Sequence, residues 1–256
     1  MVGLSTKKRM VISETCMPDL LLALCENKQN PTLLDVGVNV GQTLLSFKAS
    51  FPEGVYRGFE PIPASVFYVQ NLIKKNSITD SVVIPAGLSD VTGIVKIYVS
   101  SNYPTGSGST MSLGIKSLKK KTASYAAVYR LDELYEKLEI GGVDVIKIDV
   151  EGSESLVLKG AVSTIQKFLP PIIIEILPED GKNKARSVQK DAILKFCEQL
   201  GYELWKVEKN GSELFCLRRL NGNVHAFGLN QEEGRDYVLL PDGYQCSNPR
   251  MQLLTS

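Results

Sequence analysis

The sequence contains a single histidine, His225, and this scarcity argues against several classes of catalytic site. A Ser-His-Asp hydrolase would have to use that one residue as its base, and any metal site that requires two histidines is excluded. Cysteine is scarce too: the five cysteines are an odd number and form no Cys-x-x-Cys pair. This usage favours reduced thiols in a cytoplasmic protein over a disulfide framework or a zinc site.

Long apolar runs and an excess of one charge are also missing. No run approaches the length of a membrane span, and the longest early one, Leu20–Cys25, lacks the layout of a signal peptide. With 29 basic and 28 acidic residues, the formal net charge is +1, which argues against a general nucleic-acid or membrane-surface binder. The 256 residues, 43% of them hydrophobic, predict one large globular domain with a substantial core.

Strand-like runs alternate with segments of helical period along the chain, which predicts a mainly parallel sheet covered by helices. The expected strands are 33–36, 55–60, 82–86, 143–150 and 172–177, with an added antiparallel strand at 94–99. Asn210-Gly211 separates two further strand-like runs, 202–207 and 213–217, and Asn-Gly in this setting predicts a hairpin. We therefore expect the sheet to close with an antiparallel last strand.

One segment, Ser100–Thr122, is expected to be a long loop. It is rich in serine and glycine, and four lysines follow at its end: Lys116, Lys119, Lys120 and Lys121. A loop of this length in a compact domain is usually either functional or disordered. Two interpretations stay open: a solvated basic loop, or a lid that orders over an acceptor.

The stretch TLLDVGVNVGQT, Thr32–Thr43, has the layout of a nucleotide-binding turn: an apolar run, an acid and then glycines. Glycines let the backbone turn sharply and approach a ligand, and the next helix presents free N–H groups there. A dinucleotide fingerprint needs Gly-x-Gly-x-x-Gly, but Asn39 and Gln42 occupy the second and third glycine positions. An acid inside the strand suits a ligand with a cationic group better than a pyrophosphate.

Glu60 stands at the end of the second expected strand, about 20 residues after the glycine turn. This spacing is typical of a carboxylate that accepts hydrogen bonds from ribose hydroxyls, although a solvent-facing acid at a strand end would look the same. An acid before the glycines and a second acid for a ribose together fit S-adenosylmethionine. That molecule has an ammonium, a sulfonium and a ribose, but no phosphate.

A second cluster of charges lies in VDVIKIDVEGSESLVLKG, where Lys147, Asp149 and Glu151 alternate and are expected to share one face of a strand end. Burying these charges is costly unless they pair or act in catalysis. One interpretation is a structural ion pair of Lys147 with Asp149 or Glu175. The position favours function, because open α/β sheets bind ligands beyond the carboxyl ends of their strands.

Several motifs together make the chain resemble the FkbM-type methyltransferases. They are LLDVGVNVGQT, GFEPIPASVFYVQNLIKKN, AGLSD, YRLDELY, VIKIDVEGSESLVLKGA and IIIEI, in the order and spacing of that family, from about Leu33 to Val207. The resemblance implies an S-adenosylmethionine-dependent O-methyltransferase of the Rossmann-like class I α/β fold. It implies a seven-stranded, mostly parallel sheet with an antiparallel last strand and helices on both faces. We expect a helical extension at 1–30, the methyltransferase domain at 31–219 and a packed C-terminal extension at 220–256.

The resemblance also implies roles for individual residues. Residues that would line the methionine part of the cofactor are Asp35, Gly37, Asn39 and Gly41, and those that would border the adenine are Leu88, Ser89 and Asp90. Glu60 would take the ribose hydroxyls, while Asp149 and Glu151 would face the methyl-transfer site. Val38 departs from the family pattern, in which a small alanine is more typical, and this can alter the packing of the turn.

A hydroxyl acceptor needs a base, and carboxylates are the available candidates because the single histidine lies outside the motifs. We expect Asp149 to be the base, with Glu151 second, Glu175 in support and Lys147 orienting Asp149. Two carboxylates are too few to argue for a metal, so none is expected. The expected acceptor is a sugar, glycan or other small molecule. Alternatives are an RNA-directed methyltransferase, against which the net charge speaks, and a catalytically silent binding module. The sequence does not determine the oligomeric state.

Overall fold

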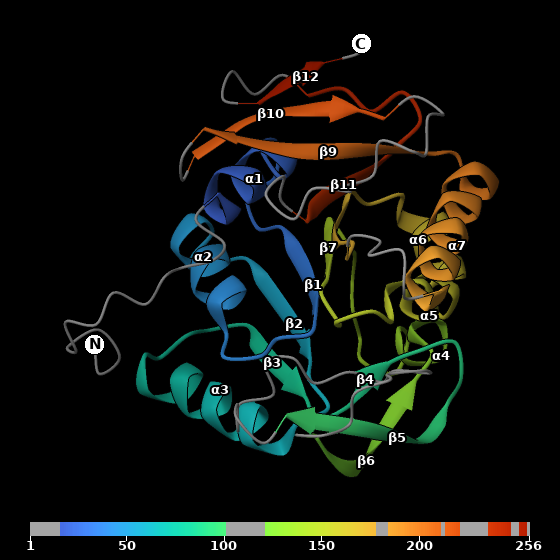
Figure 1. The fold of residues 1–256 in the computed structure, drawn as a ribbon. Coiled ribbons are helices and arrows are strands. Elements are labelled where there is room, and N and C mark those ends of the chain that lie inside the picture. The colour runs from blue at the N-terminus through green and yellow to red at the C-terminus, as the bar shows by residue number, and fades with distance from the viewer. Residues whose placement is uncertain are drawn as a thin grey trace.

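The computed structural model describes residues 16–100, 121–177, 184–210, 213–220, 235–246 and 251–254. In this part of the chain, nine strands form the main sheet, in the order β12-β10-β9-β11-β8-β7-β1-β2-β3 (Figure 1). Their bounds are β1 (Thr32–Val36), β2 (Val55–Phe59), β3 (Ser81–Ile84), β7 (Val145–Ile148), β8 (Ile172–Glu175), β9 (Tyr202–Asn210), β10 (Glu213–Arg219), β11 (Asp236–Pro241) and β12 (Gln252–Leu254).

Five neighbouring strands, β3, β2, β1, β7 and β8, run parallel to one another. Beyond them, β11 is antiparallel both to β8 and to β9, so β9 points in the same direction as the five parallel strands. The sheet is therefore mixed but mainly parallel on one side. This arrangement confirms the predicted α/β class.

The predicted number of seven strands is wrong, because the main sheet has nine within the described residues. The predicted hairpin exists, since β9 and β10 pair antiparallel. However, the antiparallel strand next to the parallel ones is β11, and β10 lies one strand further out, followed by β12. A hairpin motif predicts that two consecutive strands pair. It does not predict that a later segment will enter the sheet between the hairpin and the strand before it.

The division of the chain into 1–30, 31–219 and 220–256 stays a prediction. The structure adds two facts that bear on it. Strand β11, which belongs to the last of these ranges, lies inside the main sheet. Helix α1 (Met17–Leu24), which belongs to the first, buries Leu20, Leu21 and Ala23 in the same core as Val238 of β11.

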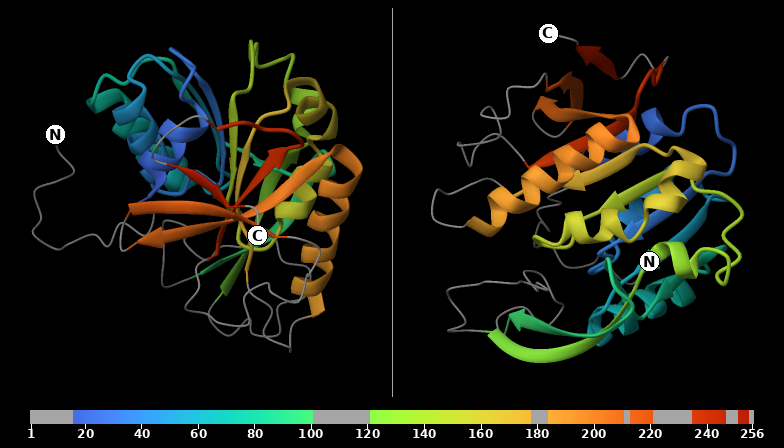
Figure 2. Two further views of the ribbon diagram at one scale, coloured as in Figure 1. Left: turned by 90° about the horizontal axis from the view of Figure 1, so that it is seen from above. Right: turned by 90° about the vertical axis from the view of Figure 1, so that its right-hand side faces the viewer.

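Helices cover both faces of the sheet (Figures 1 and 2). One face carries α1, α2 (Gln42–Ser50) and α3 (Pro63–Lys75), and the other carries α4 (Leu131–Leu134), α5 (Glu154–Lys159), α6 (Val162–Phe168) and α7 (Lys184–Leu200). Side chains alternate between the two faces along each strand. Leu33 and Val145 therefore pack in the core under α1, α2 and α3, while Leu34 and Ile146 pack in the core under α4 to α7. Within the described ranges, no helix is both long and apolar enough to cross a membrane.

A small second sheet follows from the end of β3 and lies below the main sheet in Figure 1. It consists of β4 (Gly87–Leu88), β5 (Gly93–Ser100) and β6 (Lys121–Tyr129), in the order β4-β6-β5. The antiparallel strand predicted at 94–99 is confirmed, since β5 pairs antiparallel with β6. The predicted loop Ser100–Thr122 covers residues 101–120, which lie outside the described residues, and its last two residues begin β6.

The interior position of β11 predicts an unequal cost for two similar substitutions. Val238 of β11 is fully buried, whereas Val82 of β3 is half exposed. Val238→Ala should lower the free energy of unfolding by about 1–3 kcal/mol, because it removes buried methyl groups and leaves a cavity. The control Val82→Ala should change it by less than about 0.5 kcal/mol. Urea denaturation of both variants measures this, and equal losses would contradict the interior position of β11.

Candidate active site

The glycine turn after β1 is pressed against the end of β7. Gly37 has a φ of +93°, a conformation that residues with a Cβ rarely adopt, and its N–H donates to the Phe59 carbonyl at 2.9 Å. A Cβ built on Gly37 would lie 1.9 Å from the carbonyl oxygen of Asp149. Only glycine therefore lets the turn and the Asp149 backbone come this close.

Glu60, directly after β2, holds the same turn from the other side. Its Oε2 accepts a hydrogen bond from the Asn39 N–H at 2.8 Å, and its Oε1 accepts one from the Ile62 N–H at 2.9 Å. Burial raises the pKa of Glu60, and these two N–H donors oppose the increase. Each carboxylate oxygen can accept a further bond, so the contacts within the protein leave room for a ligand hydroxyl.

Asp35 of β1 and Lys147 of β7 are neighbours in the strand register. Asp35 is fully buried and Lys147 is 4% exposed. The Lys147 Nζ lies 3.8 Å from Asp35 Oδ1 and 3.4 Å from Asp149 Oδ2. The Tyr56 hydroxyl donates to Asp35 Oδ2 at 2.5 Å. One buried ammonium thus links an internal carboxylate to a carboxylate at the strand end.

Tyr56 is a site residue that was not predicted from the sequence, although a nearby glycine, Gly58, indicates its position. Gly58 is the register partner of Asp35, and a Cβ on it would lie 2.9–3.0 Å from the Tyr56 ring and hydroxyl. The tyrosine ring crosses the space that a side chain at position 58 would fill. A glycine in a strand interior often indicates such a close approach, so Tyr-x-Gly in β2 is the sequence feature that could have identified this contact.

Acidic side chains gather at the ends of β7 and β8. The pKa of Glu175 is raised to about 8, and burial is the largest cause. The charges of Asp149 and Glu151 and a hydrogen bond with Asp149 also raise it. The Arg235 Nη1 lies 3.7 Å from Glu175 Oε1. Strand β7 is shorter than the predicted 143–150, because it ends at Ile148 and the chain then turns through Glu151, whose φ is +56°. The expected sharing of one strand face therefore stops at Asp149.

Comparison with known proteins identifies the family of this chain. The family model described as the methyltransferase FkbM domain matches residues 35–204, which is more than half of the chain. The chain belongs to the FkbM methyltransferase domain family. This confirms the resemblance drawn from the motifs, and the domain is a methyltransferase domain.

Two curated relatives match the FkbM domain of this chain. Methyltransferase sdnD of Sordaria araneosa is 23% identical over 177 residues, 59% of this chain and 68% of that protein. Hexuronic acid methyltransferase AglP of Haloferax volcanii is 31% identical over 159 residues, 60% of this chain and 59% of that protein. A solved FkbM methyltransferase from Methylobacillus flagellatus KT superposes with a TM-score of 0.51 at 14% identity, over 82% of this chain and 44% of that one. This likeness supports the fold.

The predicted site residues of the FkbM domain fall into two groups. The turn residues Gly37 and Asn39, together with Glu60 and the charges around Lys147, come together at the carboxyl ends of β1, β2 and β7. The predicted adenine segment, Leu88–Asp90, begins beside the residue that follows Glu60, because a Cβ on Gly87 would be 3.7 Å from Pro61. The roles predicted for all these residues stay predictions.

Two further charged residues reach this region without having been predicted. Glu154 is 2% exposed, and its Oε1 accepts the Gly152 N–H at 2.8 Å. Burial raises the pKa of Glu154 to about 7. Arg235 is brought beside β8 by β11, and its carbonyl accepts the Ile176 N–H at 2.9 Å. The Glu-Gly-Ser-Glu motif could have pointed to Glu154, but no local pattern joins Arg235 to Glu175 across 60 positions of sequence.

Buried Glu154 predicts a pH dependence of stability. Its folded-state pKa, about 7, lies above the ordinary value of 4.5, so the folded protein holds a proton that the unfolded chain releases. The stability this proton provides is complete below about pH 4.5 and is lost as the pH rises to about 7. Glu154→Gln should remove this loss while Gln Oε1 still accepts the Gly152 N–H.

Thermal unfolding between pH 5 and pH 8 measures this effect, with Glu136→Gln on the exposed surface as the matched control. The Glu154→Gln variant should lose less melting temperature than the wild type as the pH rises, and Glu136→Gln should follow the wild type. Parallel curves for all three proteins would show that Glu154 is not the group responsible.

Proposed function

We propose that this protein is an S-adenosylmethionine-dependent O-methyltransferase that acts on a hydroxyl of a sugar, glycan or other small molecule. The observation that carries the proposal is the pairing of Asp149 with Lys147 and Glu175 at the carboxyl ends of β7 and β8, beside the glycine turn. There a carboxylate that can accept a proton stands next to a turn that can approach a ligand. Membership of the FkbM family supports the methyl-transfer chemistry.

The residues around the glycine turn fit S-adenosylmethionine. The bound molecule would supply a methyl group already activated on a sulfonium. Glu60 and Asp149 place carboxylates on either side of the turn, which suits a ligand with two cationic groups and a ribose. Gly37 keeps the turn free of a Cβ, and the first helix N–H groups of α2 follow at Gly41, whose φ is +81°. Glu60 would accept the ribose hydroxyls with its remaining lone pairs.

Asp149 is the proposed base. Its side chain is 31% exposed, whereas Lys147 behind it is nearly buried, so the carboxylate can reach both the lysine and a bound acceptor. Because the pKa of Glu175 is about 8, Glu175 is mainly protonated at neutral pH and can donate a hydrogen bond to Asp149. Asp149 would accept the proton of the acceptor hydroxyl as its oxygen takes the methyl group, while the S–CH3 bond breaks and leaves a neutral thioether. Glu151 remains the second candidate for this role.

Lys147 orients Asp149 in this proposal. Its Nζ donates to Asp149 Oδ2 at 3.4 Å, and Asp35 holds the same ammonium from within the core. The two contacts fix the position of the ammonium, and the ammonium in turn fixes the Asp149 carboxylate at the strand end. Alignment of the acceptor with the methyl group can lower the activation barrier by roughly 7–11 kcal/mol, and a fixed base is part of that alignment.

A sugar acceptor is supported by one relative, whose name states that it is a hexuronic acid methyltransferase. Arg235 adds a partly exposed cation beside Glu175, in a region otherwise lined by carboxylates. The net charge of +1 keeps nucleic acid outside the proposal, and the cysteine usage supports the cytoplasm as the location. The segment Ser100–Thr122, interpreted above either as a solvated basic loop or as a lid, carries Lys116, Lys119 and Lys120, which lie outside the described residues.

The Asp149→Asn variant tests this proposal. Asparagine keeps the size of the side chain but cannot accept the proton as a carboxylate does, so turnover should fall about 10²–10⁴-fold. S-adenosylmethionine binding should stay within a fewfold of the wild type. Transfer of a labelled methyl group to a panel of neutral and acidic sugars measures turnover, and calorimetry measures binding.

Asp191→Asn, on the exposed surface of α7, is the matched control and should keep full turnover. If Asp149→Asn transfers methyl groups as fast as Asp191→Asn, Asp149 has no part in proton transfer. If the wild type methylates none of the sugars, the acceptor class is wrong.

A further inference from the structure

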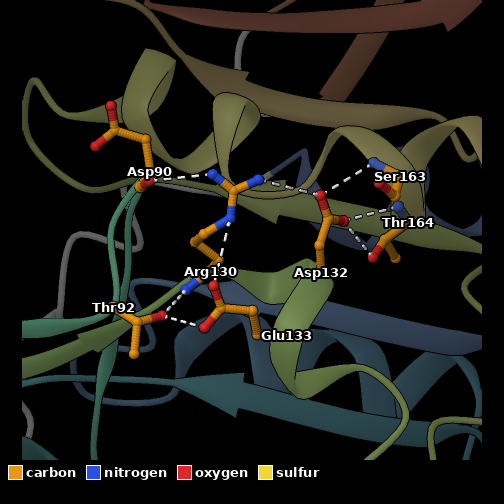
Figure 3. A network of polar contacts seen from close by, with 7 residues as sticks. All are labelled: Asp90, Thr92, Arg130, Asp132, Glu133, Ser163 and Thr164. Atoms are coloured by element: carbon orange, nitrogen blue, oxygen red, sulfur yellow. Dashed lines mark hydrogen bonds and ion pairs between the residues drawn. The ribbon is translucent and has the colours of Figure 1, made fainter.

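We propose that Arg130 is a positioning residue that fixes the Leu88–Asp90 segment and thereby sets the selectivity of the site for an adenine base. This inference rests on the proposed function, in which that segment borders the adenine of S-adenosylmethionine. Arg130 stands between β6 and α4, and Figure 3 shows how its side chain reaches Asp90 at the end of the segment.

Arg130 contacts the segment through its side chain, and it contacts Thr92, two residues further along, through its backbone (Figure 3). The Nη1 donates to the backbone carbonyl of Asp90 at 3.2 Å, and the backbone N–H donates to Thr92 Oγ1 at 3.2 Å. The Thr92 hydroxyl in turn donates to Glu133 Oε2 at 2.6 Å. The chain from Asp90 to Thr92 is thus fixed at two points by residues of the β6–α4 junction.

The guanidinium is itself held by two carboxylates of α4. Its Nη2 lies 3.8 Å from Asp132 Oδ2, and its Nε lies 3.7 Å from Glu133 Oε1. Asp132 also accepts hydrogen bonds from α6: the N–H of Ser163 at 3.1 Å, and the N–H and hydroxyl of Thr164 at 2.8 Å each. Arg130 therefore links the segment to a helix that packs on the main sheet.

A second contact holds the segment at Ser89. A Cβ built on Gly160, between α5 and α6, would lie 1.9 Å from the carbonyl oxygen of Ser89. The Ser89 N–H donates to the Tyr129 carbonyl at 2.9 Å, one residue before Arg130. Ser89 is 4% exposed and Leu88 is 2% exposed. Strand β6 and the α5–α6 junction therefore hold the segment at Ser89, and Arg130 holds it at Asp90.

The chemistry of Asp90 explains why its position would affect base selectivity. A carboxylate only accepts hydrogen bonds, so it favours a base with a 6-amino group over one with a 6-oxo group. Its Oδ1 accepts from Ser89 Oγ at 3.4 Å, and a carboxylate with one such bond has further lone pairs with which it would accept from the 6-amino group. If Arg130 no longer holds the Asp90 carbonyl, the carboxylate loses its fixed place and discrimination falls.

If Arg130 only stabilised the fold, its substitution would weaken the binding of both compounds equally. A large effect on stability is not expected, because the Arg130 side chain is 37% exposed and exposed ion pairs contribute little to stability. The test compares the affinities of the wild type and Arg130→Gln for S-adenosylhomocysteine and S-inosylhomocysteine, which differ in the 6-amino group. The wild type should prefer the adenine compound. The variant should lose roughly tenfold in affinity for it, the effect of about one weakened polar contact, and should bind the inosine compound nearly as before.

Turnover provides the second measurement. With saturating S-adenosylmethionine, Arg130→Gln should keep a kcat close to the wild-type value, because Lys147 and Asp149 are untouched, while its KM for S-adenosylmethionine rises. Arg130→Lys keeps the positive charge but lacks the planar fork, so it should restore part of the selectivity. Arg218→Gln is the matched control, since Arg218 pairs with Glu208 on the β9–β10 hairpin.

The outcomes separate this inference from the proposed function. Equal losses of affinity for both compounds, or an unchanged ratio in Arg130→Gln, would overturn the positioning role even if the wild type is an active methyltransferase. A wild type that binds neither compound would remove the proposed function and this inference with it. A lower kcat with an unchanged KM would place Arg130 in the chemical step instead, and would also overturn the inference.

Discussion

The structure of the candidate site depends on one buried cation. Lys147 sits in the central strand β7 with almost no contact with water, and such a charge is strongly destabilising unless carboxylates surround it. Asp35 of the neighbouring strand supplies one carboxylate, and Tyr56 fixes that carboxylate in place. Asp149 supplies the other at the strand end, so the need to neutralise Lys147 also decides where the proposed base stands.

Close backbone approaches then assemble the site around this charge. Gly37 lets the turn after β1 meet Asp149, Gly58 lets Tyr56 reach Asp35, and Gly160 lets the α5–α6 junction meet Ser89. Each contact joins segments that are distant in the sequence. The glycines therefore set the relative positions of the turn, the base and the proposed adenine segment, while Glu60 and Arg130 hold the loops with directed hydrogen bonds.

The sequence predicts the features that local pattern controls. The parallel strands, the glycine turn and the β9–β10 hairpin follow from apolar runs, glycine spacing and Asn-Gly, and the combined motifs predict the FkbM family, which the comparison confirms. The sequence does not predict that β11 lies between β8 and β9, because the insertion of a strand depends on contacts between segments far apart in the chain. For the same reason it does not predict Arg235 beside Glu175. The burial of Glu154 likewise depends on how α5 meets the sheet.

The central claim is that the carboxyl ends of β1, β2 and β7 form a site for a cationic nucleoside, with Glu60 taking the ribose and no provision for a pyrophosphate. The most direct test is calorimetric titration of the purified protein with S-adenosylmethionine, with NAD as the control. The account predicts saturable 1:1 binding of S-adenosylmethionine and no measurable heat with NAD. Binding of NAD in its place, or of neither compound, would contradict it.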